Sequence, residues 1–288
     1  MTDQASELRR IATESNSKPT QVITVASGKG GVGKSSVALN IAIAMSRKGR
    51  RVLIIDTDFG FSNIDVMLGV STRHDLMDVI QRDMDIRDII EPGLEGVQFI
   101  SGGSGVYEMT QLDGGQLMRI VNNLKQLEDV ADTIIFDTGA GASDNMLRLI
   151  YASNETLLVT TPEPTAIVDA YALIKIVGEK GSARMRLLIN KADSAGEAAT
   201  VMDCIARIAQ KNVNVRIDKL GYIIRDINMQ KAVRMQVPIL VSFPHCLAST
   251  NIDSIVSKMV ETPTGANERS GFRGFWERFL TKNTIYSG

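Results

Sequence analysis

The sequence has few cysteines, few aromatic residues and no long hydrophobic run. Its two cysteines, Cys204 and Cys246, lack C-x-x-C spacing, which argues against a disulfide framework or an iron–sulfur site and favours a reducing cytoplasm. The net charge of -1 gives no support to a surface that coats nucleic acid, so no direct nucleic-acid partner is expected. The amino terminus lacks the apolar segment of a signal peptide, and no apolar run is long enough to cross a bilayer. These absences predict a cytoplasmic globular protein that meets a membrane only at its surface.

What is present is a steady alternation of short apolar strands and helices between residues 21 and 260. Most of the strands are apolar on both faces, as expected when helices cover both sides of a parallel sheet. The pattern predicts a doubly wound α/β domain, with a mostly parallel sheet of about seven to eight strands and ligands at the carboxyl ends of the strands. The expected strands are Val22–Ala26, Val52–Asp56, Val97–Ser101, Thr133–Asp137, Thr156–Thr160, Arg186–Asn190 and Leu220–Ile224.

Short segments of different character flank this domain. Residues 1–20 read as an amphipathic helix over 1–12 followed by a polar linker. Residues 261–288 read as a linker rich in helix-breaking residues, followed by a second short amphipathic helix from Phe272 onward. The sequence therefore predicts one α/β domain with a functional helix at each end.

A glycine-rich loop follows the first strand and leads into a helix. The segment SGKGGVGKSS satisfies G-x-x-x-x-G-K-[ST], in the strand–loop–helix context that a phosphate-binding loop requires. Glycines let backbone N–H groups approach phosphate, and the helix directs its positive end at the anion. Lys34 is expected to neutralise the β and γ oxygens, while the hydroxyl of Ser35 is offered to Mg²⁺. The predicted ATP- and ADP-binding loop comprises Gly28, Lys29, Gly30, Gly31, Val32, Gly33, Lys34, Ser35 and Ser36.

Three carboxylates follow two of the predicted strands. The strand RVLIIDTD ends in Asp56 and Asp58, and period two places both on the same side of the strand. The strand DTIIFD ends in Asp137, which is the Walker B pattern. One carboxylate can orient the attacking water, and the others can hold Mg²⁺. The sequence therefore predicts Mg²⁺-dependent ATP hydrolysis, with Ser35, Asp56 and Asp137 at the metal.

The K-G-G-V-G-K-S loop resembles the deviant Walker A loop of the MinD/ParA (SIMIBI) ATPases. The resemblance implies that Lys29 is the lysine that reaches across a face-to-face homodimer to the nucleotide of the partner subunit. It also implies that Asp58 activates water and that Asp137 is the Walker B aspartate. Lys29, Lys34 and Asp58 are then the catalytic residues of a slow, regulatory ATPase.

Two further segments carry the same resemblance. The stretch GFSNIDVMLG from Gly60 to Gly69 and the segment TTPEPTAIVDAYALIK are similar to the corresponding parts of MinD-like proteins. By this likeness Asn190, at a strand end, hydrogen-bonds adenine. Asp226 and Pro238 lie in RDINMQKAVRMQVP, which resembles the base-contacting region of the family.

Within the family the sequence resembles the branch of flagellar-number regulators called FlhG, FleN or YlxH. The amino terminus reads D-Q-A-S-E-L-R, similar to the D-Q-A-x-x-L-R motif with which that branch stimulates an FlhF-type GTPase. The resemblance implies control of flagellar number or placement. It also implies binding to flagellar switch-complex proteins or to a flagellar transcription regulator. The predicted partner-binding residues are Asp3, Gln4, Ala5, Leu8 and Arg9.

The carboxyl-terminal helix has an aromatic stripe with basic residues on its other side. The spacing i, i+3, i+4, i+7, i+8 places these apolar side chains on one helix face, as an interfacial membrane helix requires. The sequence thus predicts reversible attachment to the inner face of the cell membrane, with docking of the helix on the ATPase domain as the alternative. The predicted membrane residues are Phe272, Phe275, Trp276, Phe279 and Leu280.

Two other functions are compatible with this fold. One is a MinD-type septum-positioning or ParA-type partitioning ATPase, although MinD lacks the amino-terminal motif and the net charge gives ParA-type DNA binding little support. The other is a metabolic or metal-cluster enzyme. A nitrogenase-type reductase needs cysteines after the Walker B strand, and this sequence has none there.

Overall fold

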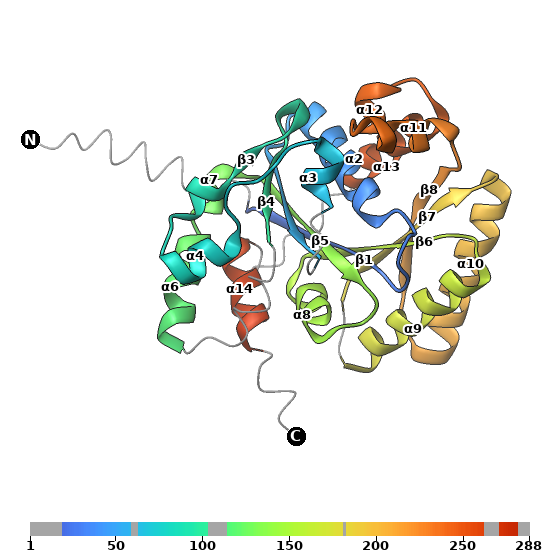
Figure 1. Cartoon of the computed structure of the whole chain (residues 1–288). Coiled ribbons are helices and arrows are strands. Elements are labelled where there is room, and N and C mark those ends of the chain that lie inside the picture. Colours follow the sequence, from blue (N-terminus) through green and yellow to red (C-terminus); the bar gives the residue numbers. More distant parts are fainter. Residues whose placement is uncertain (1–18, 59–62, 103–113, 181–182, 262–270, 282–288) are drawn as a thin grey trace, which may run out of the picture.

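A single eight-stranded sheet forms the centre of the molecule (Figure 1). The computed structural model describes residues 19–58, 63–102, 114–180, 183–261 and 271–281. The strand order is β3-β4-β2-β5-β1-β6-β7-β8, and every neighbouring pair is parallel except β3 with β4. The order reverses direction around β1, which is where ligands bind in sheets of this type.

All seven expected strands are present, so the doubly wound fold predicted from the sequence is confirmed. The eighth strand is β3, which is only two residues long and contains a proline, so no apolar run announces it. Strand β3 is the outermost strand on this side of the sheet and pairs antiparallel with β4. A short edge strand leaves few unpaired backbone groups for another chain to bind. The strands are β1 Gln21–Ser27, β2 Val52–Thr57, β3 Glu91–Pro92, β4 Gln98–Ser101, β5 Thr133–Ala140, β6 Glu155–Thr160, β7 Met185–Ala192 and β8 Ile217–Ile224.

Helices cover both faces of the sheet, because alternate strand residues point to opposite sides. Ile23, Ile54 and Ile135 face one helical layer, while their neighbours Val22, Leu53 and Ile134 face the other. The first layer contains α2 Lys34–Arg47, α3 Ile64–Leu68, α11 Ile227–Met235, α12 Ile239–Ser242 and α13 Leu247–Glu261. The second contains α4 Leu76–Arg82, α6 Gly114–Leu124, α7 Leu127–Val130, α8 Asp144–Ala152, α9 Pro164–Lys180, α10 Ala195–Val213 and α14 Phe272–Thr281. Two 3-10 turns, η1 Ile86–Ile89 and η2 Leu94–Gly96, flank β3.

The carboxyl-terminal helix α14 is docked on the sheet (Figure 1). Its side chains Phe272, Phe275, Trp276 and Phe279 are at most 2% exposed. The ring of Phe275 stacks on Phe136 of β5, with centroids 5.0 Å apart. In this structure the aromatic stripe therefore faces the protein core, as the docking alternative expects, and its contact with a membrane stays a prediction. The physical reason is the large apolar area that these rings remove from water.

A polar contact also holds α14. The guanidinium of Arg278 donates from Nε and Nη2 to the carbonyl oxygen of Ala152, at 2.9 and 2.6 Å, at the last residue of α8. The side chain of Leu280 lies outside the described residues, as do residues 1–18 with the predicted helix and its partner motif. Within the described ranges, no helix has the length and apolar character needed to span a bilayer.

Candidate functional site

The glycine-rich loop connects β1 to α2 at the carboxyl edge of the sheet. Gly31 and Gly33 adopt φ angles of 77° and 90°, in the left-handed region that favours glycine. Gly28 is needed for another reason: a Cβ there would lie 2.3 Å from the carbonyl oxygen of Asp169. Helix α2 begins at Lys34 without any side-chain cap, so its first N–H groups are available to an anion.

Lys34 reaches the Walker B aspartate. Its Nζ lies 2.7 Å from Oδ1 of Asp137, and both side chains are buried. The second oxygen of Asp137, Oδ2, is buried without any hydrogen-bond partner in the structure. A buried carboxylate oxygen without a partner is costly, and it fits a site that a metal ion or its water completes. Burial raises the pKa of Asp137, while the ion pair with Lys34 acts in the opposite direction.

Asp56 lies beside Asp137, because the two residues are register partners on β2 and β5. Its carboxylate accepts three backbone N–H groups, from Asp58 at 3.0 Å, Asn63 at 2.8 Å and Ile64 at 3.2 Å. Burial, and secondly the charge of Asp137, raise the pKa of Asp56 to about 6. Asp56 therefore anchors the start of α3 as well as contributing a carboxylate to the site.

Asp58 follows β2 and is half-buried. Its Oδ2 accepts a hydrogen bond from the side-chain amide of Asn63 at 3.2 Å. A Cβ at Gly139 would lie 3.1 Å from its Oδ1, so the glycine leaves room for this carboxylate. The three aspartates predicted from the sequence thus lie together at the carboxyl ends of β2 and β5. Asn63 is an additional residue that holds Asp58 in place.

Lys29 is held within its own subunit. Its Nζ lies 3.2 Å from Oε2 of Glu163 and 2.6 Å from Oγ1 of Thr165, at the start of α9. Neither Glu163 nor Thr165 was singled out from the sequence. The signal available was their position in the TTPEPT segment, directly after β6 and therefore at the same edge of the sheet. The structure places the Lys29 side chain beside Glu163 and Thr165, at the border of the phosphate-binding site. Its expected role in a dimer stays a prediction.

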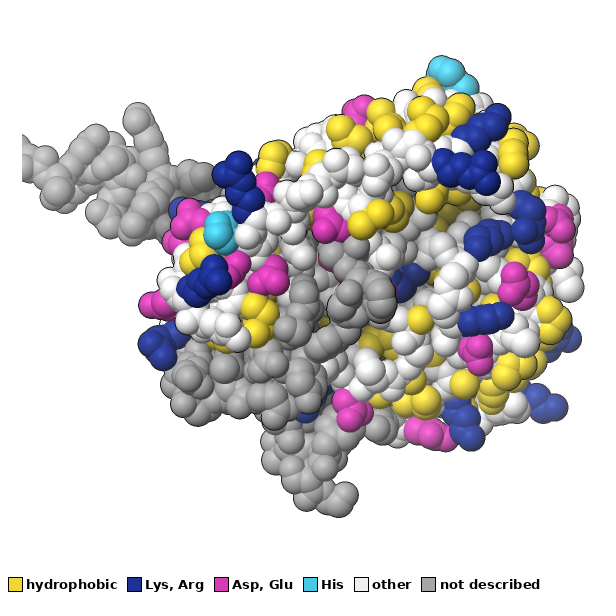
Figure 2. Space-filling view, viewed as in Figure 1, with side chains coloured by type: hydrophobic (Ala, Val, Ile, Leu, Met, Phe, Trp, Pro, Cys, Tyr) yellow, Lys and Arg dark blue, Asp and Glu magenta, His cyan; other side chains and the backbone are white. Residues whose placement is uncertain are grey.

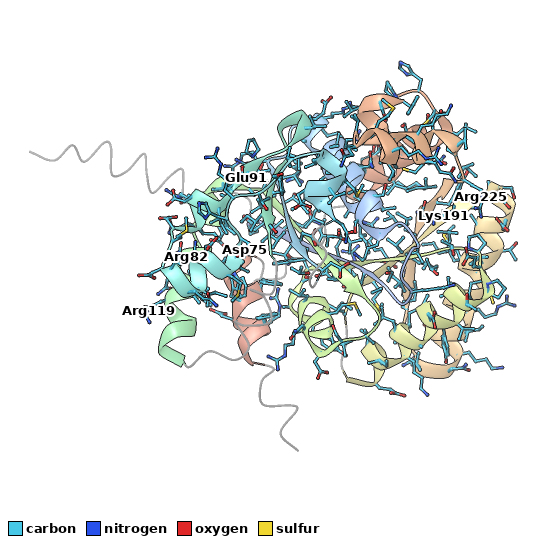
Figure 3. All side chains as sticks on the ribbon, in the orientation of Figure 1. Asp75, Arg82, Glu91, Arg119, Lys191 and Arg225 are labelled. Carbon is cyan, nitrogen blue, oxygen red and sulfur yellow. The ribbon has the colours of Figure 1, made fainter. Side chains whose placement is uncertain are left out.

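The loop is braced from β7. The amide of Asn190 donates to the carbonyl of Val32 at 2.8 Å, and a Cβ at Gly33 would lie 2.5 Å from Asn190 Nδ2. Lys191, which has a φ of 57°, donates from Nζ to the carbonyl of Gly31 at 2.6 Å (Figure 3). Asn190 therefore positions the phosphate loop in this structure, and its contact with adenine stays a prediction.

The other two predicted base contacts have structural roles. Asp226 caps α11, accepting the N–H of Asn228 at 2.9 Å, and also accepts the N–H of Ala248 at 3.4 Å. Pro238 is buried before α12 and lines a small hollow with Ser36, close to the phosphate loop. Both residues lie at the β8 side of the site. Asp3, Gln4, Ala5, Leu8 and Arg9 lie outside the described residues.

Cysteine or histidine metal clusters are not part of this site. No group of three or more His, Cys, Asp or Glu side chains within the described ranges is arranged to hold a metal ion by itself. A P-loop Mg²⁺ takes most of its ligands from water and phosphate oxygens, so this result is compatible with the predicted Mg²⁺ site at Ser35, Asp56 and Asp137, which stays a prediction.

Comparison with known proteins agrees with this geometry. Residues 18–260 match the family model of the ParA group described as NUBPL iron-transfer P-loop NTPase. The antiactivator FleN of Pseudomonas aeruginosa is 35% identical over 263 residues, covering 91% of this chain and 94% of FleN. The flagellum site-determining protein YlxH of Helicobacter pylori is 31% identical over 294 residues, covering 97% of this chain and 99% of YlxH.

Solved structures show the same fold. A chain of the MinC:MinD cell division protein complex of Aquifex aeolicus has a TM-score of 0.67 at 20% identity, covering 88% of this chain and all of that one. MinD of Pyrococcus horikoshii complexed with Mg-ADP also has a TM-score of 0.67, at 21% identity, covering 86% of this chain and all of that one. With the phosphate loop, two loop lysines and three aspartates in place, the chain belongs to the ParA/MinD family of P-loop NTPases.

Proposed function

We propose that the protein is a slow Mg²⁺-dependent ATPase that forms a homodimer with ATP and regulates the number or placement of flagella. The observation that carries the enzymatic part is the meeting of Lys34, Asp137, Asp56 and Asp58 at one edge of the sheet. Backbone N–H groups of the loop and the start of α2 bind the phosphates, and Lys34 balances their charge. Bound Mg²⁺ would be held by Ser35 and the carboxylates of Asp56 and Asp137, and it neutralises charge on the transferred phosphate.

Asp58 is assigned to the attacking water. It is less buried than Asp56 and Asp137, and its carboxylate is held by Asn63 rather than by a cation. A carboxylate so placed accepts the hydrogen bond of a water and takes up its proton as the bond to phosphorus forms. Asn63 limits the rotation of this carboxylate and so orients the water.

Lys29 supplies the dimer-dependent element. In the structure it bonds to exposed Glu163 and Thr165 rather than to the buried phosphate site of its own subunit. It is thus free of the structural ties that hold Lys34, and can exchange these exposed contacts for the nucleotide of the partner subunit. In the ATP-bound symmetric dimer, Lys29 of each subunit would thereby complete the site of the other subunit. Hydrolysis of ATP would let the two subunits separate.

The flagellar assignment rests on the similarity to FleN and YlxH, which cover 91% and 97% of this chain. MinD of Bacillus subtilis is 28% identical and covers only 76% of this chain. The amino-terminal D-Q-A-S-E-L-R segment supports stimulation of an FlhF-type GTPase. Switch-complex proteins or a flagellar transcription regulator would be further partners of the dimer. Attachment to the inner face of the membrane would require α14 to leave its place on the sheet, because its aromatic rings are buried there.

One experiment tests the proposal in cells. The gene is deleted in its own host, and wild-type, Lys29→Ala or Lys34→Ala protein is restored at equal level. We expect an altered flagellar number in the deletion, rescue by the wild type and no rescue by either variant. Normal flagella combined with minicells in the deletion would replace the flagellar assignment by septum positioning. Sedimentation of the three purified proteins with a non-hydrolysable ATP analogue tests the dimer separately.

A further inference from the structure

The end of strand β7 turns toward the phosphate loop. The pairing of β7 with β8 loses its regular register just before Ala192, and Lys191 has a φ of 57° there. In a regular strand, Asn190 and Lys191 would point to opposite faces of the sheet. The irregular backbone instead directs both side chains to the loop, where the first donates to the carbonyl of Val32 and the second to that of Gly31. Irregular backbone of this kind is common beside functional sites.

Asp193 is the next polar residue after this strand end. It lies two residues beyond Lys191, so its Cα is within about 7 Å of the Cα of the lysine that contacts the loop. The side chain of Asp193 is 70% exposed. Figure 2 shows lysine and arginine side chains, with acidic side chains beside them, on the surface over the ends of β7 and β8. Asp193 therefore lies at the surface, next to the residues that hold the phosphate loop.

Both the backbone and the carboxylate of Asp193 are held in place. Its N–H donates to Oε2 of Glu197 at 2.8 Å, in the turn that leads into α10. Its Oδ1 accepts a hydrogen bond from Nε of Arg225 at 2.9 Å, and the N–H of Arg225 donates to the carbonyl of Ala192 at 2.8 Å. Figure 3 shows Arg225 and Lys191 at the ends of neighbouring strands. A carboxylate has about four acceptor positions, so Asp193 can accept two further N–H groups from a ligand.

A nucleotide whose phosphates are bound by the loop extends along the carboxyl edge of the sheet. N7 is an acceptor in both adenine and guanine, so the amide of Asn190 cannot distinguish the two purines. The opposite edge of the base differs, because guanine carries N1–H and N2–H donors side by side, whereas adenine carries an N1 acceptor beside its N6–H donors. A carboxylate accepts both donors of guanine in charge-assisted hydrogen bonds, and it repels the N1 lone pair of adenine. The carboxylate of Asp193 is therefore suited to guanine.

From these observations we infer that the nucleotide site accepts guanine nucleotides as well as adenine nucleotides, and that Asp193 is the residue that recognises guanine. Asn190 contacts N7 of the base, and the methylene chain of Lys191 supports the ring. Asp193, held by Arg225, accepts the N1–H and N2–H groups. The inference specifies the base of the substrate, and it rests on the proposed function only in that the phosphate loop binds a nucleotide.

Isothermal titration calorimetry of the full chain with Mg²⁺ measures the affinities for ADP, GDP and xanthosine diphosphate. We expect the wild type to bind GDP with a dissociation constant within about tenfold of that for ADP, because the two nucleotides share the phosphate and N7 contacts. Asp193→Asn should weaken GDP binding by about tenfold or more, because an amide cannot accept both donors of guanine. The same variant should keep its ADP affinity within about threefold, which also shows that it is folded.

Xanthosine diphosphate provides a gain of affinity that a damaged fold could not produce. Xanthine has a carbonyl where guanine has its 2-amino group, so this edge presents one donor and one acceptor, which match the amide of an asparagine. Asp193→Asn should therefore strengthen the binding of xanthosine diphosphate by about tenfold or more. The matched control is Asp203→Asn, because Asp203 is also exposed and paired with a cation, Lys219, but lies within α10. Asp203→Asn should leave all three affinities unchanged.

The outcomes separate this inference from the proposed function. Binding of ADP but not of GDP by the wild type would overturn the inference and leave the proposed ATPase intact. The same holds if Asp193→Asn and Asp203→Asn change the GDP affinity equally, or if Asp193→Asn gains no affinity for xanthosine diphosphate. Binding of GDP but not of ADP would reject the proposed ATPase and keep the recognition of guanine. Binding of neither nucleotide would reject both.

Discussion

Lys29 and Glu163 form an ion pair within one subunit, with Nζ and Oε2 3.2 Å apart, although Lys29 is the residue expected to act on the partner subunit. Both side chains are exposed by a third or more, so the pair is worth at most about 1 kcal/mol. Each symmetric dimer breaks two such pairs, so Glu163→Gln should release Lys29 and strengthen the ATP-dependent dimer by no more than about thirtyfold. Glu179→Gln, on the same helix and paired with Lys175, is the matched control in sedimentation with an ATP analogue.

Two substitutions separate binding from hydrolysis. Lys34→Ala should abolish ATP binding, because the phosphates lose their fixed counter-ion and Asp137 is left as an uncompensated buried charge. Asp58→Ala should retain binding and lower the hydrolysis rate by about 10²–10⁴-fold. Binding is measured with a fluorescent ATP analogue and hydrolysis by phosphate release. Hydrolysis at the wild-type rate in Asp58→Ala would show that another group activates the water.

Asn63→Ala tests the support of Asp58. The amide holds Asp58 at 3.2 Å, so its loss should lower the hydrolysis rate by about tenfold and leave ATP affinity within about twofold. Asn63→Asp should be worse than Asn63→Ala, because a second carboxylate would repel Asp58. An unchanged rate in Asn63→Ala would mean that Asp58 is oriented by other contacts once ATP is bound.

Asp56 should make the stability of the nucleotide-free, metal-free protein depend on pH. Its pKa is raised from 3.8 to about 6, so the folded state holds a proton that the unfolded state has already lost. The free energy of unfolding should therefore fall, through this group, as the pH rises from about 4 to about 6, by about 3 kcal/mol in all. Asp56→Asn should remove this contribution, seen as the difference between wild-type and variant urea unfolding curves at each pH. Asp65→Asn, on α3, is the control.

Trp276 reports where α14 lies. It is the only tryptophan in the sequence and is 2% exposed, so its emission should be blue-shifted in the nucleotide-free protein. With an ATP analogue and anionic vesicles, a membrane role predicts an emission change together with co-sedimentation of protein and vesicles. Unchanged emission and no co-sedimentation would leave α14 as a permanent part of the core.

The same helix contributes to stability. Phe275 stacks on Phe136 and is fully buried, so Phe275→Ala should cost about 3–5 kcal/mol of unfolding free energy. Val168→Ala, at an exposed position, should change stability by less than about 0.5 kcal/mol. Urea unfolding checks both variants, and a loss of under about 1 kcal/mol in Phe275→Ala would show that α14 is only loosely held.

The sequence predicts the parts of the structure that are set by local pattern. Helix α2 begins at Lys34, where the phosphate-loop motif predicts the start of a helix, and Gly49 follows its end. Strand β3 is set by its pairing with Phe99 rather than by its own residues, so no pattern reveals it. An aromatic stripe is equally suited to lipid and to a sheet, and only the presence of Phe136 beneath it decides the contact.

The candidate site likewise contains residues that the sequence predicts and contacts that only the fold creates. Lys34, Asp56, Asp58 and Asp137 follow from motifs at strand ends, and the structure gathers them. The contact of Lys29 with Glu163 joins residues far apart in the sequence, so it requires the fold. Asp226 is an aspartate before a helix, and its capping of α11 could have been expected from that position alone.

Phe136 and Asp137 are consecutive residues of β5 that face opposite sides of the sheet. One contacts the tail helix and the other contacts the phosphate-loop lysine. A chain shortened before Phe272 would expose the ring of Phe136 to water, directly next to the residue that pairs with Lys34. Inactivity of such a truncated protein would therefore not identify a lipid anchor, since a damaged ATPase core would give the same result.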